Sequence, residues 1–165
     1  MMRISHFCLR VVLAASIGLF APEFMTTSAW ADTDGGNKTI VFVCLHGVVN
    51  SQMAAAYFNK AASERGLPYR AVSRGIDPYS SIPVPIRDGL ALDGLDPTNA
   101  PGVLTPADAN NAGRLLAFDA VPAELKGNAS VTYWSGVPLG INDYDAARDA
   151  ILQRIDELIS TLAME

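Results

Sequence analysis

The chain has 165 residues with a formal net charge of −5, and 50% of its residues are hydrophobic. This length and apolar content suffice for one domain with its own core, but not for two. The acidic balance, with no basic block in the sequence, excludes the usual electrostatic footprint of a nucleic-acid-binding protein and disfavours binding to a membrane surface.

The first 31 residues are typical of a cleavable signal peptide. Two arginines give a basic start, and the apolar run at 11–21 is too short to span a bilayer. The residues Ala-Trp-Ala at 29–31 fit the small-x-small rule for cleavage. We therefore expect a periplasmic or secreted protein that starts at Asp32 and has no membrane segment after cleavage. The alternative is an uncleaved membrane anchor.

Cleavage changes both the charge and the cysteine content. Two arginines and one glutamate are removed, so Lys plus Arg falls from 12 to 10, Asp plus Glu from 17 to 16, and the net charge from −5 to −6. Cys8 is also removed, which makes Cys44 the only cysteine. Because no internal disulfide can form, the Cys44 thiol is buried and inert, reactive, or paired with another molecule.

Residues 32–38 form a polar lead-in that we expect to be flexible, and one domain at 39–165 follows. Consecutive apolar residues predict strands buried on both faces, and apolar residues at spacings of three and four predict helices. The expected elements are a strand at 39–44, helix 51–65, strand 68–74, helix 84–93, a short helix at 105–113 opened by Thr105, strands 114–119 and 131–134, and helix 142–163. This alternation predicts a three-layer α/β domain with a four-stranded parallel sheet flanked by helices.

The segment Cys-Leu-His-Gly-Val-Val-Asn-Ser at 44–51 connects the first strand to the first helix. Ligands bind at this edge of parallel sheets, and the free N–H groups of a helix N-terminus attract anions. Gly47 can adopt a positive φ angle, which lets successive amides point inward. Those amides and the Ser51 hydroxyl favour a thiolate at Cys44. The segment therefore predicts an anion site with a reactive thiol.

This arrangement resembles the phosphate-binding loop of low-molecular-weight protein tyrosine phosphatases and of the arsenate reductases that share their fold. The resemblance continues through Ala-Val-Ser-Arg-Gly at 71–75, the helix-like segment 84–96 and Leu-Leu-Ala-Phe-Asp at 115–119. It implies a flavodoxin-like topology, no cofactor, and a phosphate-like oxyanion or a phosphorylated substrate as the partner.

The resemblance also implies roles for individual residues of the loop. Cys44 corresponds to the nucleophile that takes the phosphoryl group, and Ser51 corresponds to the hydroxyl that activates it. The oxyanion cradle would be formed by the loop backbone, that is by Leu45, His46, Gly47, Val48, Val49 and Asn50.

Two departures from the family pattern predict impaired catalysis. Asn50 stands where the family has an arginine that holds two phosphate oxygens, a loss that costs on the order of 10²-fold or more in rate. Ser135 and Gly136 stand where the family has the aspartate that protonates the leaving oxygen, which contributes about 10²- to 10⁴-fold. Together they predict a deficit of roughly four orders of magnitude or more.

Other side chains are candidates to replace these groups. His46 is either an exposed loop residue without a role or a source of charge in the pocket. Arg74 is either a solvated surface residue or a second source of positive charge. Asp119, Asp143 and Asp145 are the nearest carboxylates, although none is in the expected register. Cys44 and His46 without a third ligand predict no metal site.

Three functions remain open at this point. The first is an exported, impaired cysteine-dependent phosphomonoesterase. The second is a catalytically inactive relative that binds phosphate or arsenate, and the third is a redox-responsive thiol protein. Thioredoxin-coupled arsenate reduction needs further cysteines, which residues 32–165 do not contain.

Overall fold

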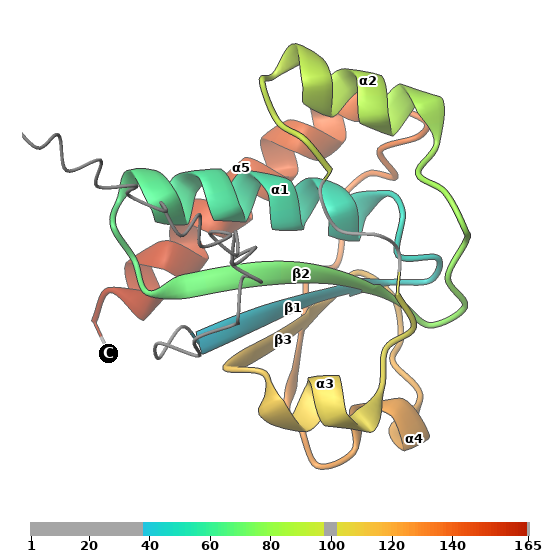
Figure 1. Ribbon diagram of the computed structural model, residues 1–165, viewed down its shortest axis with the longest axis vertical. Helices are drawn as coiled ribbons and strands as arrows, with labels where there is room; N and C mark the ends of the chain where they lie inside the picture. The colour runs from blue at the N-terminus through green and yellow to red at the C-terminus, as the bar shows by residue number, and fades with distance from the viewer. Residues whose placement is uncertain (1–37, 98–101, 165) are drawn as a thin grey trace, which may run out of the picture. The chain divides into compact units, whose positions relative to one another are not determined.

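Figure 1 shows a computed structural model that describes residues 38–97 and 102–164. The predicted signal peptide and all but the last residue of the lead-in lie outside the described residues. Four strands pair in parallel in the order β2-β1-β3-β4, which confirms the predicted sheet. They are β1 (Lys38–Cys44), β2 (Tyr69–Gly75), β3 (Arg114–Ala117) and β4 (Val131–Tyr133).

Helices cover both faces of this sheet (Figure 1). On one face lie α1 (Asn50–Glu64), α2 (Val84–Leu92) and α5 (Tyr144–Leu162), and on the other α3 (Pro106–Asn111) and α4 (Ala123–Lys126). The four residues of α4 are too few to show a helical period, so the sequence did not predict this helix. None of the described helices is long and apolar enough to span a bilayer.

The apolar run of β1 results from burial on both faces of the sheet. Ile40 and Phe42 pack with α1 and α5, whereas Val41 and Val43 pack in the second core beneath α3. Successive strand side chains point to opposite faces, so a central strand needs an apolar residue at every position. This burial fixes the register of β1 and brings its last residue, Cys44, to the carboxyl edge of the sheet.

Side-chain caps mark the starts of two helices, α3 and α5. Thr105 caps α3 as predicted, with its hydroxyl accepting from the Asp108 N–H at 3.0 Å and its own N–H donating to the Asp108 carboxylate. The last helix begins at Tyr144 because the Asp143 carboxylate accepts from the Ala146 N–H at 3.0 Å.

A polar cluster fixes α1 against α2 and α5. The Tyr57 hydroxyl donates to the carboxylate of Asp93, and the hydroxyl oxygens of Tyr57 and Tyr144 are 2.8 Å apart. A Cβ atom on Gly89 would lie 2.4 Å from the Tyr144 ring, so α2 approaches α5 closely at this glycine. Burial, then the bonds to Asp93 and Tyr144, raise the pKa of Tyr57 far above its ordinary value, and the phenol stays neutral.

Candidate active site

The loop between β1 and α1 lies at the carboxyl edge of the sheet and starts at a buried thiol. Cys44 is 7% exposed, and α1 begins at Asn50. Gly47 has a φ angle of 68°, in the left-handed region that favours glycine. The strand therefore delivers the thiol to the start of a tight loop that leads directly into a helix N-terminus.

A chain of hydroxyl groups begins at the sulfur. The Cys44 Sγ and Ser51 Oγ atoms are 2.9 Å apart, and the Ser73 Oγ is 2.8 Å from the Ser51 Oγ and 2.9 Å from the Gly47 carbonyl oxygen. Ser51 and Ser73 are completely buried. When the sulfur is a thiolate, Ser51 can donate to it while accepting from Ser73.

Ser73 was not among the site residues selected from the sequence. It is a fully buried hydroxyl in β2, and β2 pairs directly with β1. The signal that marks it is a small polar side chain on the same strand face as the apolar Ala71, near the end of a predicted strand, since buried polar groups require partners.

The first three carbonyls of the loop accept hydrogen bonds from outside it. Those of Cys44, Leu45 and His46 accept from the N–H groups of Ile76, Asp77 and Tyr79 at 3.3, 2.8 and 3.1 Å. Gly47 and Gly75 allow this approach, because a Cβ atom on Gly47 would lie 2.8 Å from the Gly75 nitrogen. The segment after β2 therefore braces the outer side of the loop.

The loop amides, by contrast, are open. Within the described part of the chain, the N–H groups of residues 46–51 have no hydrogen-bond acceptor. The N–H of Leu45 differs from the expected cradle, because it donates to the Asp119 carboxylate at 2.8 Å. Unpaired N–H groups at a helix N-terminus form the arrangement that binds anions.

Asn50 does not act as a substitute for the arginine clamp. Its Nδ2 donates to the Pro138 carbonyl and its Oδ1 accepts from the Gly140 N–H, both at 2.9 Å. The residue is 4% exposed, so both ends of the amide are used inside the protein. The Asn50 side chain thus connects the first turn of α1 to the segment before α5.

The segment that precedes α5 carries no carboxylate at the expected position. Gly136 has a φ angle of 80°, and nothing lies within 4 Å of the place where its Cβ would be. Of the other candidates, Asp143 caps α5 and Asp145 pairs with Arg148 at 2.8 Å. Among the described residues, Asp119 is the only carboxylate hydrogen-bonded to residues 44–51.

His46 is held at the side of the loop. Its ring stacks on Tyr79 with the ring centroids 3.8 Å apart. Its Nδ1 is 2.9 Å from the Asp77 carbonyl oxygen, and since a carbonyl only accepts, Nδ1 carries the proton. These contacts make His46 a brace between the loop and the segment after β2.

Arg74 does not supply charge to the loop. Its guanidinium pairs with Asp108 at 3.1 Å and donates to the Ser73 carbonyl at 2.9 Å. Burial alone would raise the pKa of Asp108, but the bonds from Arg74 and Thr105 outweigh it and lower the pKa. The Arg74 charge is therefore neutralised at the N-terminus of α3.

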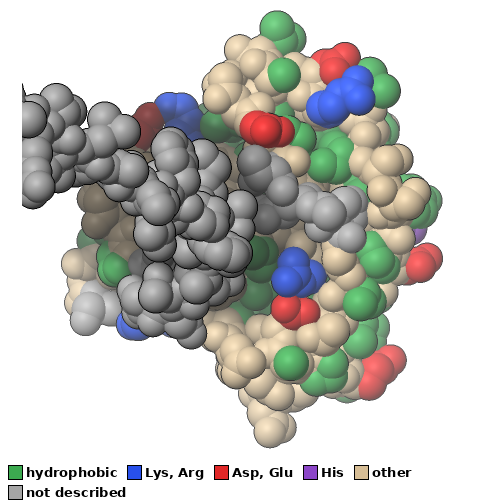
Figure 2. Space-filling view, viewed as in Figure 1, with side chains coloured by type: hydrophobic (Ala, Val, Ile, Leu, Met, Phe, Trp, Pro, Cys, Tyr) green, Lys and Arg blue, Asp and Glu red, His purple; other side chains and the backbone are tan. Residues whose placement is uncertain are grey.

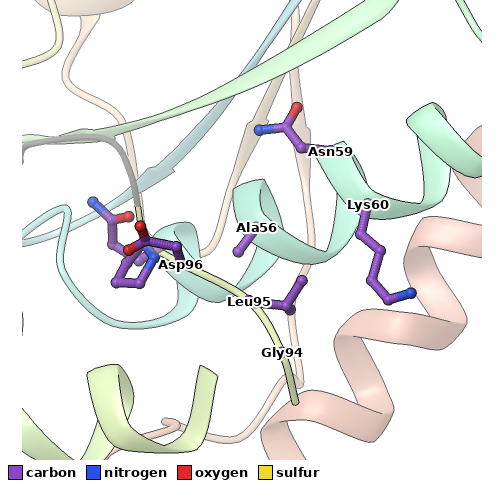
Figure 3. Close-up of a pocket in the computed structure, with 8 residues that line it drawn as sticks. Ala56, Asn59, Lys60, Gly94, Leu95 and Asp96 are labelled. Atoms are coloured by element: carbon purple, nitrogen blue, oxygen red, sulfur yellow. The ribbon is translucent and has the colours of Figure 1, made fainter. Parts of the chain in front are cut away.

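A separate cavity of about 390 Å³ lies between α1 and the segment after α2 (Figure 3). The Asn59 amide that borders it bonds both the N–H and the carbonyl of Ala71, and Lys60 pairs with Glu64. The cavity includes no residue of 44–51. Since the chain itself satisfies these polar groups, we place the candidate site at the loop.

On the described part of the face seen in Figure 2, several Lys and Arg side chains lie next to Asp or Glu rather than gathering in one patch. Within residues 38–97 and 102–164, no three His, Cys, Asp or Glu side chains are grouped to hold a metal ion.

Comparison with solved structures identifies the architecture. A low-molecular-weight protein tyrosine phosphatase from Bacillus subtilis matches with a TM-score of 0.65 and 21% identity, over 78% of this chain and 99% of that chain. The chain has the low-molecular-weight phosphatase fold. The YwlE arginine phosphatase, as a mutant with a phosphorylated active-site serine, matches with a TM-score of 0.69 and 21% identity over 76% of this chain and 95% of that one.

Arsenate reductases share the low-molecular-weight phosphatase fold. One of them, in a phosphate-binding state, has a TM-score of 0.62 and 15% identity, over 76% of this chain and 98% of that chain. No protein-family model matches the sequence, and no curated protein is similar enough to count as a relative. At these identities the likeness establishes the fold, and the activity has to be argued from the site.

Proposed function

We propose that residues 44–51 bind a phosphate-like oxyanion and that Cys44 is the nucleophile of a slow phosphomonoester hydrolysis. The observation that carries this proposal is how the backbone hydrogen bonds of the loop are divided between its carbonyls and its N–H groups. The carbonyls of residues 44–46 accept from the segment after β2, while the N–H groups of 46–51 have no acceptor among the described residues, in the loop that starts at Cys44. Fixed N–H donors stabilise negative charge without having to reorient during the reaction.

In the proposed reaction, the Cys44 thiolate attacks phosphorus, forming an S–P bond as the P–O bond to the leaving group breaks. The leaving oxygen takes a proton from water, because Gly136 offers no acid. Water then hydrolyses the cysteinyl phosphate, which releases phosphate and restores the thiolate. A structural neighbour with a phosphorylated active-site serine supports phosphoryl transfer to a side chain of this fold.

A non-catalytic oxyanion-binding protein is the second candidate, and the Asn50 contacts favour it. The Asn50 side chain brings no positive charge to a transferring phosphoryl group, and both ends of its amide are bonded, to Pro138 and Gly140. The missing clamp lowers the rate more than it lowers the capacity to bind, since the N–H donors remain. A redox switch is less supported, because Cys44 has no second thiol in 32–165 to resolve an oxidised form.

We also propose that the protein acts outside the cytoplasm. The basic start, the apolar run and the Ala-Trp-Ala site at 29–31 support export and cleavage before Asp32. The phosphatase-like domain would then begin at residue 39, after a short lead-in.

Calorimetric titration of the purified protein with phosphate and arsenate tests oxyanion binding. We expect one site per chain for each anion, with affinity that falls as salt is raised, because the donors attract charge. A titration with chloride at matched ionic strength controls for non-specific heats. The absence of a binding isotherm for both oxyanions would contradict the proposal.

Hydrolysis should increase when an acid is introduced at Gly136. Aspartate tolerates positive φ better than most residues, and the site around Gly136 is open, so we expect Gly136→Asp to raise kcat for an aryl phosphate by roughly tenfold or more. Gly94→Asp is the matched control, since Gly94 also has a positive φ angle and open space. Equal rates in the two variants would argue against an acid role at residue 136.

A further inference from the structure

A carboxylate is hydrogen-bonded to the loop of the proposed oxyanion site, and the slow hydrolysis proposed above makes no use of it. The Oδ2 of Asp119 accepts from the Leu45 N–H, immediately before the open amides of residues 46–51. Asp119 is exposed and follows β3, the strand that pairs with β1. Its second oxygen, Oδ1, has no hydrogen-bond partner among the described residues.

We propose that Asp119 makes this site selective for free oxyanions that carry a proton, such as inorganic phosphate and arsenate, over sulfate. The inference rests on the proposed oxyanion site in residues 44–51. A carboxylate can only accept hydrogen bonds, so its free oxygen can bind the O–H group of a protonated oxyanion. Phosphate and arsenate retain at least one O–H near neutral pH, whereas sulfate has none.

The charges around the loop strengthen this selectivity. Arg74 is paired with Asp108, and Asn50 is neutral and bonded elsewhere, so among the described residues no cation hydrogen-bonds the loop to offset the Asp119 charge. An unprotonated anion beside Asp119 therefore meets repulsion without a compensating hydrogen bond. A protonated anion replaces part of that repulsion with a charge-assisted hydrogen bond.

The same reasoning separates free phosphate from its esters. A doubly ionised phosphomonoester has no O–H to donate, and Asp119 disfavours it as it disfavours sulfate. The site is thus better matched to inorganic phosphate or arsenate than to an ionised ester, which adds to the reasons for slow hydrolysis.

Asp119 also braces the loop through Leu45, so the test has to separate bracing from selection. Asp119→Asn keeps an oxygen that can accept from the Leu45 N–H, but it removes the charge and presents N–H donors to the anion. Asp156→Asn is the control for net charge, because Asp156 is an exposed residue of α5 that pairs with Arg65.

Calorimetric titrations with sodium phosphate and sodium sulfate at equal ionic strength and neutral pH give the ratio of the two affinities. We expect the unmodified protein and Asp156→Asn to bind phosphate at least roughly tenfold more tightly than sulfate. In Asp119→Asn this ratio should fall by roughly tenfold or more, mainly through tighter sulfate binding.

The outcomes distinguish this inference from the proposed function. Equal affinity for phosphate and sulfate in the unmodified protein would overturn the selectivity and leave the oxyanion site standing. A ratio unchanged in a folded Asp119→Asn variant would remove Asp119 as its cause. Binding of neither anion to the unmodified protein would overturn the oxyanion site itself. Only the second outcome requires the Asp119→Asn variant.

Discussion

Replacement of Cys44 by serine is expected to abolish phosphomonoester hydrolysis while leaving oxyanion binding in place. The serine hydroxyl is a far weaker nucleophile than the thiolate, and removing a nucleophile typically costs at least about 10³-fold in rate. The N–H donors of residues 46–51 do not depend on the sulfur. Initial rates with an aryl phosphate, compared between the two proteins at equal concentration, give the result directly.

Phosphate titration of the same Cys44→Ser sample is the control for folding. The new hydroxyl can still bond Ser51, since the two side-chain atoms are 2.9 Å apart in the unmodified protein. We expect the affinity for phosphate to change by less than roughly tenfold. Turnover that persists in a phosphate-binding Cys44→Ser variant would show that Cys44 is not the nucleophile.

Gly47→Ala is expected to destabilise the protein strongly and to remove oxyanion binding. An alanine at a φ angle of 68° costs about 1–2 kcal/mol. Its Cβ would also lie 2.8 Å from the backbone nitrogen of Gly75, an overlap that costs about 1–3 kcal/mol. The free energy of unfolding in urea should therefore fall by roughly 2–5 kcal/mol, a large part of the stability of an ordinary domain.

Gly66→Ala separates the two causes of this destabilisation. Gly66 follows α1 with a φ angle of 62°, and no atom lies within 4 Å of the place where its Cβ would be. This variant should lose only the conformational part, about 1–2 kcal/mol, and keep its affinity for phosphate. Equal losses in the two variants would mean that the close approach of Gly47 and Gly75 does not constrain the loop.

The sequence was most informative where local pattern decides structure. The apolar run of β1 predicted a strand buried on both faces, and Thr105 followed by proline predicted the start of α3. Predicted ends differ by a few residues where a cap intervenes, as at Asp143. The position of Cys44 between a buried strand and a helix also follows from this pattern.

Contacts between distant segments could not be predicted in the same way. Asn50 bonds residues 88 and 90 positions away, and Leu45 bonds Asp119 at a separation of 74. The ion pair of Arg74 with Asp108 is another contact between distant segments, since Asp108 lies in α3 and Arg74 in β2. Such pairings depend on how the sheet assembles, and no spacing rule along the chain encodes them.

The central claim is that the open amides of residues 46–51 bind the oxyanion. Titration of the ¹⁵N-labelled protein with phosphate, followed by amide chemical shifts, tests it most directly. We predict that the largest shifts fall on residues 46–51 and saturate with one affinity, while the amides lining the cavity between α1 and residues 94–97 stay unchanged apart from Gln52, next to the loop. Saturable shifts confined to that cavity, or none at all, would contradict the account.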